Sequence, residues 1–168
     1  MPSSCHISPV VFDDLKSFFQ SFNFSQDSIH IQQYISLIQE ASLCYQNIVH
    51  KLVDTDTIIG FIALSTTKEV DNIAGVLIEF LYLKPNFRNT IELHSQIKYS
   101  YILLDYVVTT ALIIQKQIAI NHIYLVPIND KVRKIYKEYG FENLPASGKN
   151  EYEDYMVFNL LDEDPTIF

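Results

Sequence analysis

The chain has 168 residues, of which 48% are apolar and 13% aromatic, a composition that excludes a disordered protein and allows one sizeable hydrophobic core. Twelve Lys and Arg side chains face 20 Asp and Glu side chains, and the formal charge of −8 argues against nucleic acid and acidic membranes as partners. Two cysteines without metal-ligand spacing, and an N-terminal segment without a basic start, predict a cytoplasmic protein with no membrane span.

The spacing of apolar residues predicts an alternation of strands and helices along the whole chain. The expected elements, in chain order, are strand 5–10, helices 11–22 and 25–45, strands 47–53, 57–65 and 75–83, a helix from residue 90 or 96 to 117, strand 122–128, helix 130–139, and strands 142–145 and 154–161. This order predicts a single α/β (α+β) domain over residues 1–161, followed by an acidic tail at 162–168.

Residues 129–141, NDKVRKIYKEYGF, carry the signals of a short capped helix. Asn129 suits the N-cap, Asp130 suits the positive end of the helix dipole, and Gly140 suits the left-handed residue that ends a helix. With Tyr136 on its last turn, the stretch resembles the motif N-x-x-A-x-x-[FL]-Y-x-x-x-G-F of the GNAT superfamily of N-acetyltransferases, although Val132 replaces the small residue. Residues 78–85, IEFLYLKP, resemble the fourth strand of the same family, commonly E-F-L-A-V-x-P.

The resemblance implies a GNAT-like acyl-CoA N-acyltransferase fold, with a central mixed, mostly antiparallel sheet flanked by helices. It further implies transfer of an acetyl group from acetyl-CoA to a primary amine by direct attack. Backbone amides of Leu81, Tyr82 and Leu83 are expected to bind the cosubstrate and stabilise the oxyanion, and Asn129 matches a residue that contacts the cofactor arm. Tyr136 is the candidate general acid for the leaving thiolate, although a tyrosine at the end of an amphipathic helix is often only a core residue.

Glu79 is the carboxylate of the fourth strand and the candidate general base for the incoming amine. A glutamate in an apolar strand has a raised pKa if it is buried, as a base near neutral pH requires. The alternative is a Glu79 side chain that faces the mouth of the cleft or pairs with a lysine.

The pyrophosphate loop departs from the family pattern, because no glycine lies between Gly75 and Gly140. In the family, glycines of a [QR]-x-x-G-x-[GA] loop let backbone amides approach the phosphates at a helix N-terminus. One alignment places Lys98 and Ser100 at the glycine positions. Another gives Arg88 the first basic position and starts the helix near Asn89, capped through Glu92.

Two interpretations of this loop stay open. In the first, Arg88, Lys98, Tyr99 and Ser100 still bind the cofactor phosphates through helix-terminal amides and side-chain charges. In the second, the fold persists while cofactor binding has been lost.

Three functions are therefore compared. The leading hypothesis is an acetyl-CoA-dependent N-acetyltransferase acting on a small-molecule or peptide amine. The alternatives are a non-catalytic GNAT-fold protein that binds a ligand or partner, and a toxin that acetylates aminoacyl-tRNA, which the negative charge disfavours. No metal site is expected, because the five histidines show no paired ligand spacing, and the oligomeric state is open, with a homodimer as one option.

Overall fold

The computed structural model describes residues 5–67, 73–144 and 154–162. The element order is β1 (Cys5–Pro9), η1 (Phe12–Asp14), α1 (Leu15–Gln20), η2 (Phe24–Gln26), α2 (Ile29–Leu43), β2 (Ile48–Asp54), β3 (Thr57–Thr67), β4 (Gly75–Leu83), η3 (Pro85–Phe87), α3 (Tyr99–Gln115), β5 (His122–Leu125), α4 (Asp130–Tyr139), β6 (Glu142–Asn143), β7 (Met156–Asn159) and η5 (Leu160–Asp162). The described strands form a seven-stranded sheet in the order β1-β2-β3-β4-β5-β7-β6. The predicted mixed, mostly antiparallel α/β sheet is confirmed.

The chain divides into two compact units, one comprising Met1–Ser65 with Glu79–Leu104 and the other Thr66–Ile78 with Asp105–Phe168. Strands β3 and β4 and helix α3 each contribute residues to both units. The single domain expected over residues 1–161 stays a prediction, and the expected tail beyond residue 162 lies outside the described residues.

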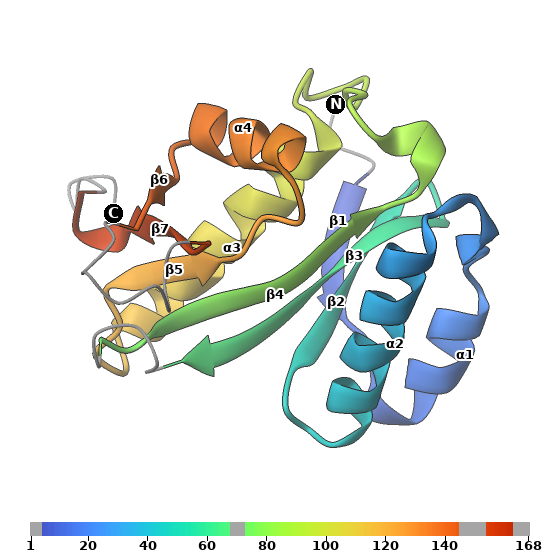
Figure 1. Ribbon diagram of the computed structural model, residues 1–168, viewed down its shortest axis with the longest axis horizontal. Coiled ribbons are helices and arrows are strands. Elements are labelled where there is room, and N and C mark those ends of the chain that lie inside the picture. The colour runs from blue at the N-terminus through green and yellow to red at the C-terminus, as the bar shows by residue number, and fades with distance from the viewer. Residues whose placement is uncertain (1–4, 68–72, 145–153, 163–168) are drawn as a thin grey trace. The chain divides into compact units, whose positions relative to one another are not determined.

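The first unit is built on three antiparallel strands. β1 pairs with β2 and β2 with β3, and the turn between β2 and β3 has left-handed φ angles of 44° at Thr55 and 66° at Asp56. Two successive left-handed residues match the right-handed twist of a hairpin, which explains the tight reversal predicted from Asp-Thr-Asp. Helices α1 and α2 lie beside each other (Figure 1).

Aromatic side chains join α1 to the sheet of the first unit. Phe61 on β3 is fully buried, and Phe18, Phe19 and Phe22 meet its ring at centroid distances of 5.8, 5.4 and 5.5 Å with interplanar angles between 74° and 78°. Such edge-to-face contacts stabilise beyond the area they bury, each by about 0.5–1.5 kcal/mol. The aromatic spacing of the first helical stretch is therefore a core pattern.

In the second unit, a short parallel ladder joins β4 to β5, from Gly75 opposite His122 to Ile78 opposite Leu125. β7 is antiparallel to both β5 and β6. The hydroxyl of Tyr139 on α4 donates to a carboxylate oxygen of Asp105 on α3 at 2.6 Å. In the part of the chain that the structure covers, no helix is long and apolar enough to cross a membrane.

Sequence and structure agree on two elements that carry the family resemblance. β4 spans Gly75–Leu83 and α4 spans Asp130–Tyr139, both with the predicted bounds. The largest difference is the start of α3, which begins at Tyr99 rather than near residue 90 or 96. β5 also ends three residues early, at Leu125.

Candidate active site

The second half of β4 extends beyond its ladder with β5. That ladder ends at the Ile78–Leu125 pair, and among the described residues Glu79–Leu83 have no β5 partner. On its other side this segment packs tightly, because a Cβ added to Gly60 of β3 would lie 2.4 Å from the Tyr82 carbonyl oxygen. One edge of Glu79–Leu83 thus has no strand partner in the described part of the sheet. Side chains already donate to the carbonyls of Glu79 and Leu83, and the backbone groups of Leu81 between them are left for an extended ligand.

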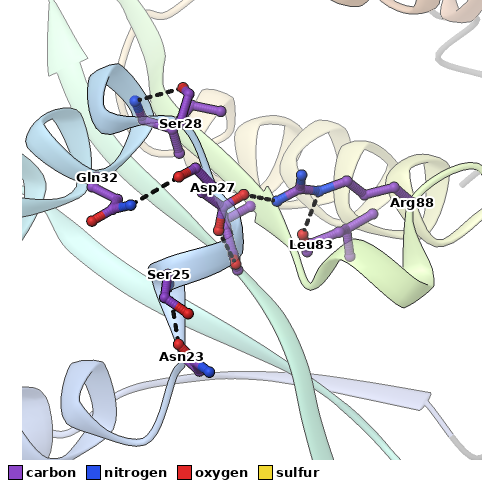
Figure 2. Close-up of polar contacts among 9 residues, drawn as sticks. Asn23, Ser25, Asp27, Ser28, Gln32, Leu83 and Arg88 are labelled. Atoms are coloured by element: carbon purple, nitrogen blue, oxygen red, sulfur yellow. Dashed lines mark hydrogen bonds and ion pairs between the residues drawn. The ribbon is translucent and has the colours of Figure 1, made fainter.

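An ion pair and two hydrogen bonds fix the end of this segment (Figure 2). The side chain of Asp27, fully buried, accepts from the Tyr82 hydroxyl at 2.8 Å and from the Arg88 guanidinium at 2.5 Å. The Arg88 Nε also donates to the Leu83 carbonyl oxygen at 2.8 Å. Burial of Tyr82, reinforced by the carboxylate to which it donates, raises its pKa above the ordinary value.

Asp27 was not found from the sequence. It lies just before the Ser28 N-cap of α2, where an acidic residue is ordinary, and its partners lie 55 and 61 residues away. Arg88, expected to face phosphate, directs its guanidinium to Asp27 and keeps 39% of its side chain exposed. Two of the five guanidinium N–H donors are therefore used inside the fold.

Glu79 is held by a polar chain that reaches α2. Its Oε2 accepts from the Asn47 Nδ2 at 2.9 Å, and the Asn47 Oδ1 lies 2.5 Å from the Ser42 hydroxyl. Asn47 and Ser42 are both buried, whereas Glu79 is half-buried. The hydroxyl of Tyr34 also donates to the Glu79 backbone carbonyl at 3.3 Å. The partner of the carboxylate is thus an amide, and no lysine pairs with it among the described residues.

Residues 88–98 form a small hairpin-like turn in place of the glycine loop. Asn89 and Gln96 have φ angles of 58° and 59°, and Ile91 pairs with Lys98 in an antiparallel bridge. The carboxylate of Glu92 accepts from the backbone amides of Ser95 and His94 at 2.5 and 3.1 Å. Hydrogen bonding from Ser95, by its side chain first and then by its backbone amide, lowers the pKa of Glu92.

A helix starting near Asn89 and capped through Glu92 is therefore wrong. The left-handed φ of Asn89 is incompatible with a helical start, and the Glu92 carboxylate caps amides within its own turn. The alternative that places Lys98 and Ser100 at the helix start agrees with the beginning of α3 at Tyr99.

The residues predicted to contact phosphate at the start of α3 differ in whether their donors already have protein partners. The Tyr99 backbone amide donates to the Thr90 carbonyl at 3.2 Å, and its hydroxyl donates to Asp54 at 2.5 Å. Lys98 lies 5.4 Å from the centre of the Tyr101 ring, and Ser100 is half-buried. Lys98 and Ser100 stay candidates for phosphate, whereas both Tyr99 donors already have protein partners.

In the second unit, α4 places the candidate acid and the candidate cofactor contact at opposite ends. The Asn129 side chain accepts from the Val132 amide at 2.9 Å, the predicted N-cap bond, and Gly140 has a φ of 128°. Tyr136 is 9% exposed, and burial raises its pKa. Its ring lies 5.8 Å from that of Phe141, so the residue also belongs to the core of this unit.

The comparisons with known proteins identify the fold. No protein-family profile matches the sequence, and no curated protein matches it significantly. Solved structures do match over nearly the whole chain, and they define the class: this chain has the fold of the GNAT acetyltransferases. The resemblance found in residues 78–85 and 129–141 is confirmed at the level of fold.

Similar structures include those of the AtaT and KacT toxins. The AtaTR complex with acetyl-CoA superposes with a TM-score of 0.72 at 16% identity, over 96% of both chains. AtaT with acetyl-methionyl-tRNAfMet gives 0.67 at 14% identity over 92% of this chain and 94% of that one. The KacTA–DNA complex gives 0.66 at 15% identity over 94% of each.

These structures correct the expected partners. A charge of −8 does not exclude nucleic acid as a partner, and that expectation is wrong, because proteins of this fold have been solved with tRNA and, as toxin–antitoxin complexes, with DNA. The small-molecule or peptide amine expected as acceptor is corrected by the same tRNA complex. Net charge sums the whole surface, whereas phosphate binding depends on the cations next to one site.

Proposed function

We propose that this chain is an acetyl-CoA-dependent N-acetyltransferase whose acceptor is the α-amino group of an aminoacyl-tRNA. The observation that carries the acetyl-transfer part is the edge of Glu79–Leu83 that has no β5 partner, on a GNAT fold. The acceptor is inferred from the tRNA-bound relative of this fold, which is an analogy between folds.

The first unit supplies the groups that act on the thioester and the amine. An extended pantetheine arm would pair with the edge of β4 that has no strand partner among the described residues, and the amides of Leu81 and Leu83, unlike that of Tyr82, which faces β3, would stabilise the charge that develops on the thioester oxygen. Glu79 would take the proton of the attacking amine. Its link to Asn47 fixes the orientation of the carboxylate before substrate binds.

The acidity of the amine favours an aminoacyl ester over a lysine as acceptor. A lysine ammonium has a pKa of about 10.4, whereas an α-ammonium has one of about 7.7–8.0. A carboxylate base such as Glu79 therefore meets a far smaller barrier with the α-amine. The lower pKa agrees with an aminoacyl ester as acceptor, and the tRNA-bound relative remains the basis for that choice.

Tyr136 in the second unit would protonate the leaving thiolate. Because burial raises its pKa, the phenol is fully protonated at neutral pH and can act as a donor. Tyrosine, with an ordinary pKa of about 10, is a weaker acid than a thiol at about 8.5, and burial increases this difference. The proton would therefore pass to sulfur as the C–S bond breaks, and solvent would return a proton to the tyrosinate.

A second candidate is a non-catalytic protein with this fold. The observation that favours it is the 88–98 turn, in which the glycine loop is absent and Arg88 is paired with Asp27. This arrangement leaves fewer groups for the pyrophosphate than the family pattern supplies.

Calorimetric titration of the purified chain with acetyl-CoA separates the two candidates. The acetyltransferase requires saturable binding that Lys98→Glu weakens, while the matched charge reversal Lys51→Glu on β2 leaves it unchanged. Mass spectrometry of aminoacyl-tRNA incubated with enzyme and acetyl-CoA then detects the acetylated α-amine. If the parent protein does not bind acetyl-CoA, the enzyme proposal fails and the binding-protein candidate stands.

A further inference from the structure

A hollow of about 270 Å³ lies within the first unit, apart from the segment to which the family resemblance assigns the pyrophosphate. It is lined by Ser21, Asn23, Gln26, Lys84, Pro85, Asn86 and Phe87. The lining comes from the turn that joins α1 to α2 and from the η3 turn that follows β4. No residue of the 88–100 segment lines the hollow, although the lining residue Phe87 directly precedes that segment.

Lys84 supplies the one formal charge in this lining. Its ammonium lies 5.2 Å from the centre of the Phe22 ring, which positions the charge without neutralising it. The neighbouring carboxylate, Asp27, already accepts from Tyr82 and Arg88. Within the described ranges, Lys84 has no ion pair with any carboxylate. The charge is therefore available to an anion.

The remaining polar lining is rich in hydrogen-bond donors. Asn23, Gln26 and Asn86 are exposed carboxamides, and the Asn23 oxygen accepts from the Ser25 amide, as Figure 2 shows. The Asn23 NH₂ group is thereby oriented as the donor end of its amide. The Ser21 hydroxyl donates to the Phe18 carbonyl at 2.6 Å and keeps its lone pairs for an incoming donor such as a ribose hydroxyl.

A cation beside several amide donors, with no carboxylate in the wall, suits a phosphate oxygen. Phe87 and Pro85 add an apolar wall, and the Phe87 ring is held against Tyr99 at a centroid distance of 5.6 Å. A nucleotide in a single strand presents a phosphate, ribose hydroxyls and the flat face of a base, and the hollow offers a partner to each of them.

We propose that this hollow binds a backbone phosphate of the single-stranded 3′ end of the acceptor tRNA, with Lys84 as its cation and the Asn23, Gln26 and Asn86 amides as donors. The proposal rests on the proposed function and names the part of the protein that holds the RNA. A chain of net charge −8 needs its cations next to the phosphates that it binds, and Lys84 supplies one such cation.

The test measures binding of a 5′-fluorescein acceptor-stem minihelix with a free CCA 3′ end by anisotropy, at several salt concentrations. The logarithm of the binding constant falls linearly with the logarithm of the salt concentration, and the slope of this line is the salt slope. Loss of one phosphate contact to a single strand reduces its magnitude by about 0.7, which corresponds to about fivefold weaker binding at 0.1 M salt. We expect this change for Lys84→Gln and a smaller one for Asn86→Ala. Lys51→Gln, which removes a lysine of β2 outside the hollow, is the matched control and keeps the parent affinity.

A second arm titrates the same variants with acetyl-CoA in the calorimeter. The proposal expects the parent dissociation constant for Lys84→Gln. A loss of acetyl-CoA affinity with unchanged RNA binding would assign the hollow to a coenzyme A phosphate and overturn the RNA site. An RNA affinity and salt slope equal to those of Lys51→Gln would also overturn it. Failure of the proposed function is a separate result, because it shows as a parent protein that does not bind acetyl-CoA.

Discussion

Asp27 and Arg88 form an ion pair in which the carboxylate side chain is fully buried and the guanidinium is 39% exposed. The same carboxylate accepts from the Tyr82 hydroxyl, so one acidic residue before α2 anchors the end of β4 and the turn that follows it. A buried carboxylate needs such partners, because isolated burial of a charge is costly.

Replacing Asp27 by alanine tests this anchor. The change leaves a buried phenol and a partly buried guanidinium without their acceptor, and we expect the free energy of unfolding to fall by about 2 kcal/mol. This is below the ~3–5 kcal/mol of a fully buried pair because Arg88 is partly solvated. Urea denaturation measures it, with exposed Asp13→Ala expected to change less than about 0.5 kcal/mol. Equal stability of the two variants would show that the pair does not anchor β4.

Gly60→Ala tests the close approach of β3 to the second half of β4. The added Cβ would lie 2.4 Å from the Tyr82 carbonyl oxygen and 2.8 Å from a Leu83 methyl carbon, so backbone must move. We expect a loss of about 1–3 kcal/mol in the free energy of unfolding, together with weaker acetyl-CoA binding. Thr57→Ala at the exposed start of the same strand is the control. Destabilisation with unchanged acetyl-CoA affinity would separate this backbone from the cosubstrate site.

Glu79→Gln tests the proposed base. The glutamine oxygen can still accept from the Asn47 amide, so folding is preserved while proton abstraction is lost. We expect kcat to fall about 100-fold or more, with the dissociation constant for acetyl-CoA unchanged. Steady-state kinetics with aminoacyl-tRNA measures the change, and Glu40→Gln on α2 serves as a control carboxylate. An unaltered kcat would remove Glu79 from the chemistry.

Tyr136→Phe tests the proposed acid. Phenylalanine keeps the ring packed against Phe141 and removes only the hydroxyl, so we expect acetyl-CoA affinity within about twofold of the parent and a kcat about 100-fold lower. Single-turnover assays with saturating acetyl-CoA report the chemical step. A variant with full turnover would leave Tyr136 as a core residue alone.

The same variant has a pH-dependent signature in stability. Since burial raises the pKa of Tyr136 in the folded state, its contribution is complete below the unfolded pKa of about 10 and is lost as the pH rises through the folded value. Between these two pKa values, Tyr136 lowers the free energy of unfolding by about 1.4 kcal/mol for each unit that the pH rises. Urea denaturation from pH 9.5 to 11 is expected to show a smaller slope for Tyr136→Phe. Tyr45→Phe, at a residue 77% exposed, is expected to keep the parent slope.

Much of the fold follows from the sequence because its signals are local. The bounds of α4 are set by an N-cap at Asn129 and a left-handed glycine at Gly140, and those of β4 by an apolar run ending before Pro85. The prediction that α3 starts near Asn89 is wrong, because an Asn-x-x-Glu pattern can cap a turn as well as a helix. Local patterns cannot tell these apart when the backbone reverses nearby.

The sequence by itself determined the order of elements, the GNAT-like motifs, and the candidate groups Tyr136 and Glu79. Only the tertiary structure decided which partners those groups and their neighbours have. Asp27 meets Tyr82 and Arg88 across 55 and 61 residues, and Asn47 meets Glu79 across 32. Burial makes such pairings obligatory for polar groups, but chain separation gives no local pattern that names the partner. The tertiary structure also decided which cation is available to an anion. Arg88 is paired with Asp27, whereas Lys84 has no carboxylate partner among the described residues.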